Sequence, residues 1–343
     1  MKRGGRLSAW VISGLKRYIL TISFLLKNVV IKTPLNLSSC LINNKKGPFT
    51  CSAVFAQSIE KVLAISVVGN HYHLRQFRYI EFTVYVGRLM MNQKTPFPQR
   101  VRNELRFREI TVLKSERVSG FQRIVFGGDA LAGFSSRGFD DHIKVFFPQD
   151  GAPFVPPEVT DEGIVWAGDV RPPSRDYTPL FDEASQQLTI DFYVHETGVA
   201  SDWAVAAKPG DTLCIGGPRG SLVVPEDYAW QLYVCDESGM PALRRRLEAL
   251  RTQAKAVQVE AIVTVADEAL KGYLAHLGEF NIQWVIGHDV QAVEAKLAAL
   301  TVPEDDYYLW ITGEGKVVKR LSEPFEGRVD PQLMRAAAYW HSK

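Results

Sequence analysis

The segment Arg175-Asp176-Tyr177-Thr178 gathers side chains that could bind a phosphorylated aromatic cofactor. On a strand alternate residues share a face, so Arg175 and Tyr177 would point the same way. A guanidinium can pair with phosphate and a phenol ring can stack on a flavin, while Thr178 adds a hydroxyl. Taken alone, the segment fits a surface strand with an incidental arginine equally well.

A second group follows, in which His195 ends an apolar run and Gly198-Val-Ala-Ser-Asp-Trp203 begins a predicted helix. Small residues at such a turn let backbone amides reach a pyrophosphate at the helix N-terminus, where Ser201 can cap and donate. His195 by itself would more commonly be a structural histidine, and Trp203 a core residue. Together they predict a second contact with the same cofactor.

The elements that must position these residues change in character along the chain. Short apolar runs separated by Gly and Pro turns predict strands at 106–125, 143–147, 175–180, 188–194 and 212–216. Many short strands with few helices indicate an antiparallel barrel. After Pro225, strands at 231–235, 259–265, 283–286 and 307–312 alternate with helices at 240–250, 266–276 and 290–300. This alternation indicates a parallel sheet.

The charge divides the chain at Met91. Residues 1–90 hold 13 lysines and arginines and two acidic residues, which gives a net charge of +11. The whole chain has 40 basic and 38 acidic residues, so residues 91–343 hold 27 basic and 36 acidic residues, a net charge of −9. We therefore expect three parts: an atypical basic extension at 1–90 that is not part of the folded enzyme, a barrel domain at 91–225, and an α/β domain at 226–343.

The first 90 residues give no clear domain pattern. The apolar run Tyr18–Leu26 is too short to span a bilayer, which takes about 20 residues. A signal peptide fits its length and basic start, but no small-residue cleavage site follows. A basic arm for nucleic acid or membrane, and a metal-binding pair at His71 and His73, are sharper alternatives. Translation from upstream of Met91, the natural initiator, explains the segment most simply.

Several function classes lack their sequence signatures. Four cysteines without CxxC or Cys/His spacing argue against a disulfide scaffold or thiol-bound metal, and Cys214 and Cys235 lie in apolar runs typical of core positions. Neither GxGxxG nor a P-loop is present, because Gly313-Glu-Gly-Lys lacks the further glycines. This counts against a standard Rossmann dehydrogenase or an NTPase.

The order RxYT, His195, GxAS, Trp203, Gly210-Asp211 and Gly217-Pro-Arg-Gly220 resembles the siderophore-interacting protein family. The resemblance covers essentially all of 91–343. It continues through Cys235-Asp-Glu-Ser-Gly-Met-Pro-Ala-Leu and Trp310-Ile-Thr-Gly-Glu-Gly. One departure is Ser238-Gly239, where many members carry Thr-Ala, although serine keeps the hydroxyl.

The resemblance implies a ferredoxin-reductase-like fold, in which a flavin-binding barrel precedes a nicotinamide-nucleotide domain. It implies FAD on Arg175, Tyr177, Thr178, His195, Ala200, Ser201, Asp236 and Ser238. It further implies NADPH on Ser238, Gly239, Arg244, Arg245, Gly313 and Glu314, with an arginine for the 2′-phosphate. Arginines 244–246 could equally form a solvated helix face.

The implied activity is NADPH-dependent reduction of ferric siderophores, with the chemistry carried by the cofactor and no protein base or nucleophile. Ferric tris-catecholates are trianions, so binding to a part of net charge −9 needs local positive charge. The resemblance points to Lys144, on the strand 143–147, and Arg219, in the turn 217–220; from spacing alone both could be ordinary surface charges.

We expect a cytoplasmic monomer with no nucleic-acid partner and no stable membrane insertion. Two other functions stay open at this point. One is a general reductase that passes electrons to ferredoxin or flavodoxin, and the other is a module that binds siderophore or flavin without turnover.

Overall fold

The computed structural model describes residues 8–10, 19–21, 96–148, 155–160, 163–166, 171–195, 197–253 and 256–342. The chain forms two compact units, Met1–Gln93 and Lys94–Lys343. In the first, strands β1 (Ser8–Trp10) and β2 (Ile19–Thr21) pair antiparallel. The remaining expectations for 1–90, together with Met91 as initiator, lie outside the described residues.

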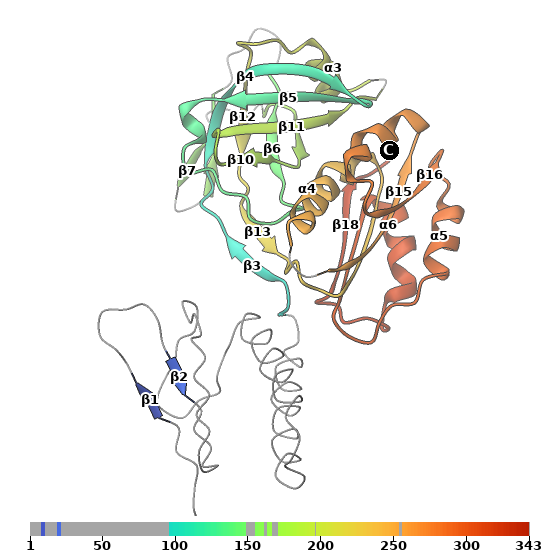
Figure 1. Ribbon diagram of the computed structural model, residues 1–343. Helices are drawn as coiled ribbons and strands as arrows, with labels where there is room; N and C mark the ends of the chain where they lie inside the picture. The colour runs from blue at the N-terminus through green and yellow to red at the C-terminus, as the bar shows by residue number, and fades with distance from the viewer. Residues whose placement is uncertain are drawn as a thin grey trace, which may run out of the picture. The chain divides into compact units, whose positions relative to one another are not determined.

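The first half of the second unit is an antiparallel barrel (Figure 1). Its strand order is β10-β11-β5-β4-β12-β6-β9. The strands are β4 (Phe107–Val118), β5 (Phe121–Gly127), β6 (Ile143–Phe146), β9 (Ser174–Tyr177), β10 (Leu180–Asp182), β11 (Gln187–Tyr193) and β12 (Thr212–Gly216). Two helices belong to it, η1 (Asp129–Leu131) and α3 (Val199–Ala206). The predicted barrel is confirmed.

Alternating inward side chains produce the barrel core. Ile110 and Val112 on β4 are buried with Ile124 and Phe126 on β5. The Ser119-Gly120 turn joins these strands with both φ angles positive, 43° and 84°, which suits the right-handed twist of a two-residue hairpin. At the other end of the sheet order, the Tyr177 ring on β9 packs against Phe192 on β11, which brings strand β9 next to β11 and closes the barrel.

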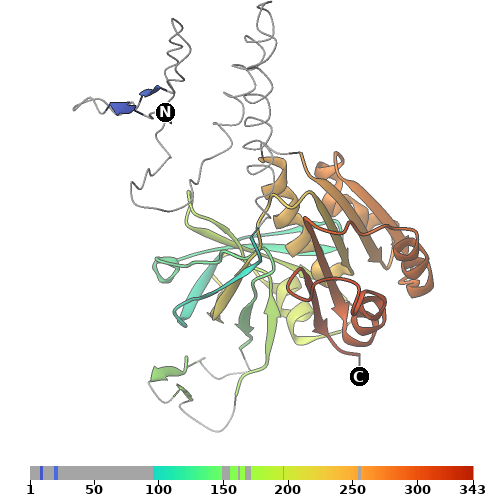
Figure 2. The same cartoon turned by 90° about the horizontal axis from the view of Figure 1, so that it is seen from below.

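Two small two-stranded sheets flank the barrel. Strand β3 (Gln99–Arg102) pairs with β13 (Gly220–Val223), just before the second half of the unit begins. Strand β7 (Glu158–Thr160) pairs with β8 (Gly163–Val165). Figure 2 shows the β7–β8 hairpin, in green, projecting from the barrel.

The second half is a parallel sheet of order β16-β15-β14-β17-β18. Its strands are β14 (Trp230–Cys235), β15 (Gln258–Val265), β16 (Asn281–Ile286), β17 (Tyr307–Glu314) and β18 (Met334–Trp340). Its helices are η2 (Glu237–Gly239), α4 (Met240–Arg251), η3 (Glu268–Leu277), α5 (Val290–Ala298), α6 (Gly315–Ser322) and η4 (Glu323–Phe325). The predicted parallel sheet is confirmed as well.

Strand β14 shows why both faces of this sheet are covered. Tyr233 and Cys235 face a core that includes Leu247 of α4, whereas Leu232 and Val234 face a core that includes Leu297 of α5. Parallel strands with both faces buried are mostly apolar, as β14 is apart from the buried Gln231. In Figure 1, α4 lies on the side of the sheet that faces the barrel.

Some predicted elements differ from the structure. A single strand at 175–180 is wrong, because β9 ends at Tyr177 and β10 begins at Leu180 and pairs with a different neighbour. Pro179 lies in the break, where proline offers no N–H for a ladder. The helix predicted at 266–276 is a 3₁₀-helix, η3, whose N-terminus is capped by the side chain of Asp267.

Candidate functional site

The RxYT segment occupies β9 and the residue after it. The Arg175 guanidinium is exposed to solvent, and its Nη1 donates to the carbonyl of Ser174 at 2.8 Å. The Tyr177 ring lies 4.5 Å, centroid to centroid, from Phe192, and burial raises the pKa of its hydroxyl above the usual value. Thr178 is buried. The strand therefore presents a free cationic head beside a fixed aromatic ring.

Helix α3 begins at Val199, shortly after His195, and forms the second part of this group. A Cβ at Gly198 would lie 2.8 Å from Cε1 of His195, so the imidazole fills the space that a side chain there would need. The backbone N–H of His195 donates to Oγ of Ser201 at 3.4 Å, and Ala200 and Ser201 are buried. No side chain caps the helix at Gly198. Its first-turn N–H groups can therefore face an anion, which the helix dipole favours.

The second part of the site is the carboxyl edge of the parallel sheet, between β14 and β17. The chain leaves β14 toward β15 on one side, and β17 lies on the other side, so the strand order reverses here. Open α/β sheets bind ligands at such a switch point. Asp236, Ser238 and Gly239 follow β14, and Gly313 and Glu314 end β17. These five residues, which the sequence assigned to cofactor binding, therefore lie at the same edge of the parallel sheet.

Hydrogen bonds fix the residues at this edge. The Asp236 carboxylate accepts from the N–H of Ser238 at 2.9 Å and its hydroxyl at 2.5 Å, and from Nε1 of Trp340 at 2.8 Å. Burial raises the pKa of Asp236, which the donors from Ser238 and Trp340 oppose. The Ser238 hydroxyl therefore donates to Asp236 and keeps only its capacity to accept a hydrogen bond from another group.

Close packing accounts for both glycines. A Cβ at Gly239 would lie 2.6 Å from Cβ of Cys235 and from Cγ2 of Thr312, and one at Gly313 would lie 2.7 Å from Oδ2 of Asp236. Gly313 also has a φ of +141°, which an L side chain rarely adopts. The chain itself fills the space beside both glycines, so packing at this edge requires glycine at each position.

Glu314 caps α6 by accepting from the N–H groups of Lys316 at 2.7 Å and Val317 at 3.0 Å. These backbone hydrogen bonds lower the pKa of the Glu314 carboxyl, and the one from Val317 has the largest effect. Its other oxygen accepts from the N–H and hydroxyl of Ser342. The C-terminal tail is therefore fastened across the edge, as Trp340 is fastened to Asp236.

Arg244 and Arg245 have other partners than those expected for a nucleotide site. Arg245 Nη1 donates to Oγ of Ser136 at 2.8 Å and its Nη2 to the carbonyl of the same residue, both in the barrel. Arg244 donates to Glu248 at 2.8 Å and lies 3.6 Å from Oδ2 of Asp191 in the barrel. These guanidiniums join the two halves of the unit, which argues against a free arginine for a 2′-phosphate at either position.

One pair at the sheet edge was not predicted. Glu237 accepts from the N–H of Ala266 at 2.6 Å and from Nε2 of His288 at 2.8 Å, so it ties the ends of β14, β15 and β16 together. The hydrogen bond to Glu237 raises the pKa of His288. The available signal was the position of each residue immediately after a predicted strand.

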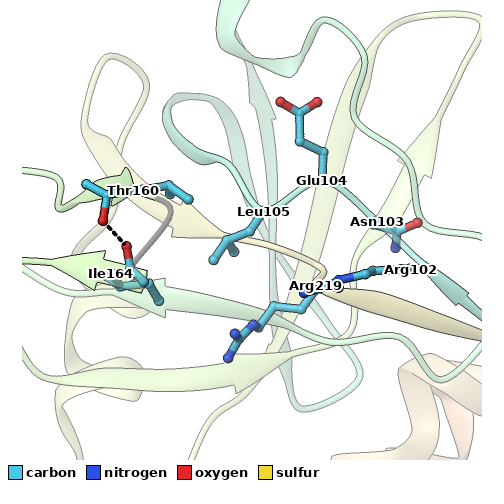
Figure 3. Close-up of a pocket in the computed structure, with 9 residues that line it drawn as sticks. Arg102, Asn103, Glu104, Leu105, Thr160, Ile164 and Arg219 are labelled. Atoms are coloured by element: carbon cyan, nitrogen blue, oxygen red, sulfur yellow. Dashed lines mark hydrogen bonds between the residues drawn. The ribbon is translucent and has the colours of Figure 1, made fainter.

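Lys144 and Arg219 lie in different surroundings. Lys144 Nζ pairs with Oδ1 of Asp176 at 2.8 Å, and both side chains are about half exposed. Arg219 lines a cavity of about 700 Å³ together with Arg102, Leu105 and the β7–β8 residues Val159, Thr160 and Ile164. In Figure 3, Arg219 and Leu105 point toward this hairpin, whereas Glu104 points away from it. Lys144 is not among the residues that line the cavity.

Three aromatic rings pack together where β8 ends, and none of them is among the residues that line the cavity. Trp166, which follows β8, lies 5.5 Å from Phe146 and 6.4 Å from Phe107, and Arg171 stacks over it at 5.8 Å. Val159 and Ile164 on the hairpin expose 51% and 39% of their surface. An exposed apolar wall beside a cation suits a flat anionic ligand.

Metal and membrane sites have little support in the described part of the chain. No group of three or more His, Cys, Asp or Glu side chains there could hold a metal ion. Cys214 and Cys235 are buried and unpaired, as predicted, and burial raises the pKa of the Cys214 thiol to about 12. No helix among the described residues is long and apolar enough to cross a bilayer.

Comparison with known families gives two matches. Residues 111–222 match the siderophore-interacting FAD-binding domain, and residues 228–343 match the siderophore-interacting protein domain. The two matches meet between the barrel and the parallel sheet.

Two curated relatives are enzymes. The chain is 66% identical over 255 residues to the NADPH-dependent ferric-chelate reductase of Escherichia coli, which covers 74% of this chain and 100% of that protein. It is 27% identical over 228 residues to the ferric vibriobactin reductase of Vibrio cholerae, covering 64% and 83%.

Among solved structures, a siderophore utilization protein from T. fusca matches with a TM-score of 0.64 and 29% identity, covering 71% of this chain and 96% of that one. The ferredoxin reductase of carbazole 1,9a-dioxygenase matches with a TM-score of 0.51 at 16% identity, which supports the fold alone.

Proposed function

The chain belongs to the siderophore-interacting protein family, and we propose that it is a flavin-dependent reductase that passes electrons from NADPH through FAD to ferric siderophores or other ferric chelates. The observation that carries this proposal is 66% identity along the whole of the Escherichia coli ferric-chelate reductase. The second unit, which begins at Lys94, contains both matched domains. Residues 91–343 are therefore the working part, with the division between FAD and NADPH domains near residue 225.

FAD fits the barrel side of the site. The exposed guanidinium of Arg175 and the uncapped N-terminus of α3 are both suited to a pyrophosphate, and Gly198 makes room for the His195 imidazole at the start of this helix. Tyr177 and Thr178 would contact the flavin, and Ala200 and Ser201 would contact the phosphates through backbone and hydroxyl groups. Asp236 and Ser238 would contact the flavin from the other domain.

NADPH fits the switch point of the parallel sheet. We expect the backbone at Gly239 and Gly313, where packing requires glycine, to line the nucleotide site, and Ser238 and Glu314 to offer polar contacts beside it. In this proposal Arg244 and Arg245 connect the two domains, because their guanidinium groups already contact groups of the barrel. They would hold the flavin and nicotinamide halves at a fixed separation.

When bound, FAD would take a hydride from NADPH and give two electrons singly to two Fe³⁺ ions, which is the redox chemistry that the protein itself lacks. The residues of the chain bind, orient and shield the reactants. Hard oxygen ligands favour Fe³⁺ over Fe²⁺, so reduction weakens the chelate and iron is released. No side chain needs to act as nucleophile.

The ferric chelate would bind in the cavity that Arg219 lines, with Lys144 on a neighbouring strand. Arg219 and Arg102 supply positive charge, and Val159 and Ile164 supply apolar surface for aromatic chelating groups. Because Lys144 already pairs with Asp176, we expect Arg219 to contribute more to the attraction of an anionic substrate.

NADPH is an intracellular reductant, so we place this activity in the cytoplasm, and we propose that the chain acts there as a monomer.

The test uses the purified full chain loaded with FAD. Mixed with NADPH and a ferric siderophore, it should lose nicotinamide absorbance and produce Fe²⁺ that a ferrous chelator traps. NADPH oxidation that requires ferredoxin or flavodoxin would favour the general reductase instead. Flavin binding without NADPH oxidation by any acceptor would leave only a binding module, and would overturn the proposal.

A further inference from the structure

Arg108 is a buried cation that the proposed mechanism does not use. It lies on β4, on the inward face that also carries Ile110 and Val112, and exposes 5% of its surface. Its Nε has no hydrogen-bond partner among the described residues. Its guanidinium carbon lies 5.5 Å from the centre of the Phe134 ring, which offsets only part of the cost of burying a charge.

A polar cavity of about 190 Å³ opens onto this guanidinium. Arg102 and Arg137 line it from two other segments of the chain, and Ser135 adds a hydroxyl. Among the described residues, none of these three arginines takes part in an ion pair. The volume is several times the share of about 30 Å³ that a water molecule has in the liquid, so it is large enough for a small oxyanion.

Glu104 is the one acidic side chain that lines the cavity within the described part of the chain. Its Oε2 accepts from Nη2 of Arg106 at 2.7 Å, and this hydrogen bond lowers the pKa of Glu104. The carboxylate is therefore neutralised by an arginine that does not line the cavity. Glu104 still attracts the buried Arg108, but burial and repulsion from Arg106 outweigh that attraction and lower the pKa of Arg108. None of the three guanidiniums forms an ion pair among the described residues.

We infer that this cavity is a binding site for an oxyanion, either a carboxylate or a phosphate. Guanidinium groups bind both in a bidentate manner, and such a ligand would satisfy the Nε of Arg108. Arg102, Asn103 and Glu104 also line the larger cavity that Arg219 borders, so the two cavities adjoin. A carboxylate arm of a ferric chelate could therefore reach Arg108 while its iron centre stays in the larger cavity, an extension that rests on the proposed function.

The binding test needs no turnover. Inorganic phosphate and iron-free citrate are titrated calorimetrically into the FAD-loaded full chain, in which the phosphate-binding groups for FAD are filled. Arg108→Met keeps the length of the side chain and removes the charge, and replacing a buried charge with an apolar group of similar volume is often neutral or stabilising. Arg117→Met is the matched control, because it removes an exposed arginine from the far end of the same strand.

We expect Arg108→Met to weaken the binding of both anions about tenfold or more, and Arg117→Met to leave it unchanged. Arg102→Met, at an exposed position on the rim, should weaken it by a smaller factor and serves if the buried variant does not fold. Equal affinity in the native chain and in Arg102→Met and Arg108→Met, or no binding to the native chain, would overturn the site.

Kinetics then separate the two sources of the anion. If phosphate raises KM for ferric citrate but not for a neutral ferric hydroxamate, the site takes the carboxylate of the chelate. If phosphate binds and changes neither KM, the site takes a free anion. A chain that binds phosphate through Arg108 but reduces no ferric chelate would refute the proposed function and leave the oxyanion site standing.

Discussion

The phenol of Tyr273, on η3, donates to the buried carboxylate of Asp191, on β11, with Oη 2.5 Å from Oδ2. The same carboxylate accepts two hydrogen bonds of 2.7 Å from Arg123 and lies 3.6 Å from Arg244 on α4. The barrel and the parallel sheet are thus joined through one buried anion. A second carboxylate, Asp140, accepts from Nε1 of Trp310 and pairs with Arg335 in the same way.

We expect Asp191→Asn to lower the free energy of unfolding by about 3 kcal/mol or more, because it leaves two partly buried arginines, Arg123 and Arg244, without this counter-charge. Urea unfolding followed by tryptophan fluorescence measures this loss. Asp176→Asn is the control, since its pair with Lys144 is about half exposed and should contribute less than about 1 kcal/mol. Equal losses in the two variants would show that Asp191 does not hold the domains together.

Arg175→Ala should weaken FAD binding by about 1.5 to 3 kcal/mol, because a phosphate loses a charged hydrogen-bond donor. The dissociation constant is measured by titrating the apoprotein with FAD and following flavin fluorescence. Arg117→Ala removes an equally exposed arginine from another barrel strand and should have no effect. Unchanged affinity in Arg175→Ala would remove this residue from the flavin site.

Gly313→Ala should raise KM for NADPH, and it should lower flavin affinity by a smaller factor, because Asp236 is the one proposed flavin contact that the new methyl group would displace. The new methyl group would lie 2.7 Å from Oδ2 of Asp236, and Gly313 has a φ of +141°. Gly327→Ala is the control for backbone strain without a steric clash, because Gly327 also has a positive φ, +71°, and nothing lies within 4 Å of the added carbon. The nucleotide assignment fails if both substitutions change KM equally.

The sequence predicted much of this fold because the patterns it contains are local. Thr212–Gly216 and Met240–Leu250 follow from apolar runs and from Pro241 in the first turn of its helix, and they match β12 and α4 closely. Strand β18 and helix α6 were not predicted. Their stability depends on docking to β17, a contact that no local pattern in 315–340 specifies.

The site residues also fall into those that a local sequence pattern predicts and those whose positions depend on long-range packing. Asp236, Gly239 and Gly313 were found because they follow strand ends, and strand ends of a parallel sheet converge at one edge. Arg244 and Arg245 are on the expected helix, but their direction depends on where the barrel packs, which the sequence does not encode locally. Arg108 was missed because its burial becomes visible only when the barrel closes around it.

The pairing of His288 with Glu237 predicts a pH dependence of stability. The pKa of His288 is raised in the folded chain, so its pairing with Glu237 stabilises the folded state. This stabilisation is fully present below the unfolded pKa of about 6.5 and is lost as pH rises through the pKa of the folded state. Because the imidazole is about half exposed, the effect should stay below about 1 kcal/mol. His288→Gln should flatten this part of the stability profile measured by urea unfolding from pH 6 upward, and an unchanged profile would contradict the assignment.

Arg219→Ala should raise KM for an anionic ferric tris-catecholate about twofold to fivefold, the range expected for one exposed charge, and Lys144→Ala should raise it less. Arg219 lines the cavity without an ion pair in the described residues, whereas Asp176 offsets Lys144. The increase should shrink as salt screens the charge, and KM for a neutral ferric hydroxamate should hardly change. Initial rates of Fe²⁺ formation at low and high ionic strength measure all of these quantities. Equal increases for charged and neutral chelates, independent of salt, would mean that the two side chains support the fold or the flavin instead of attracting the substrate.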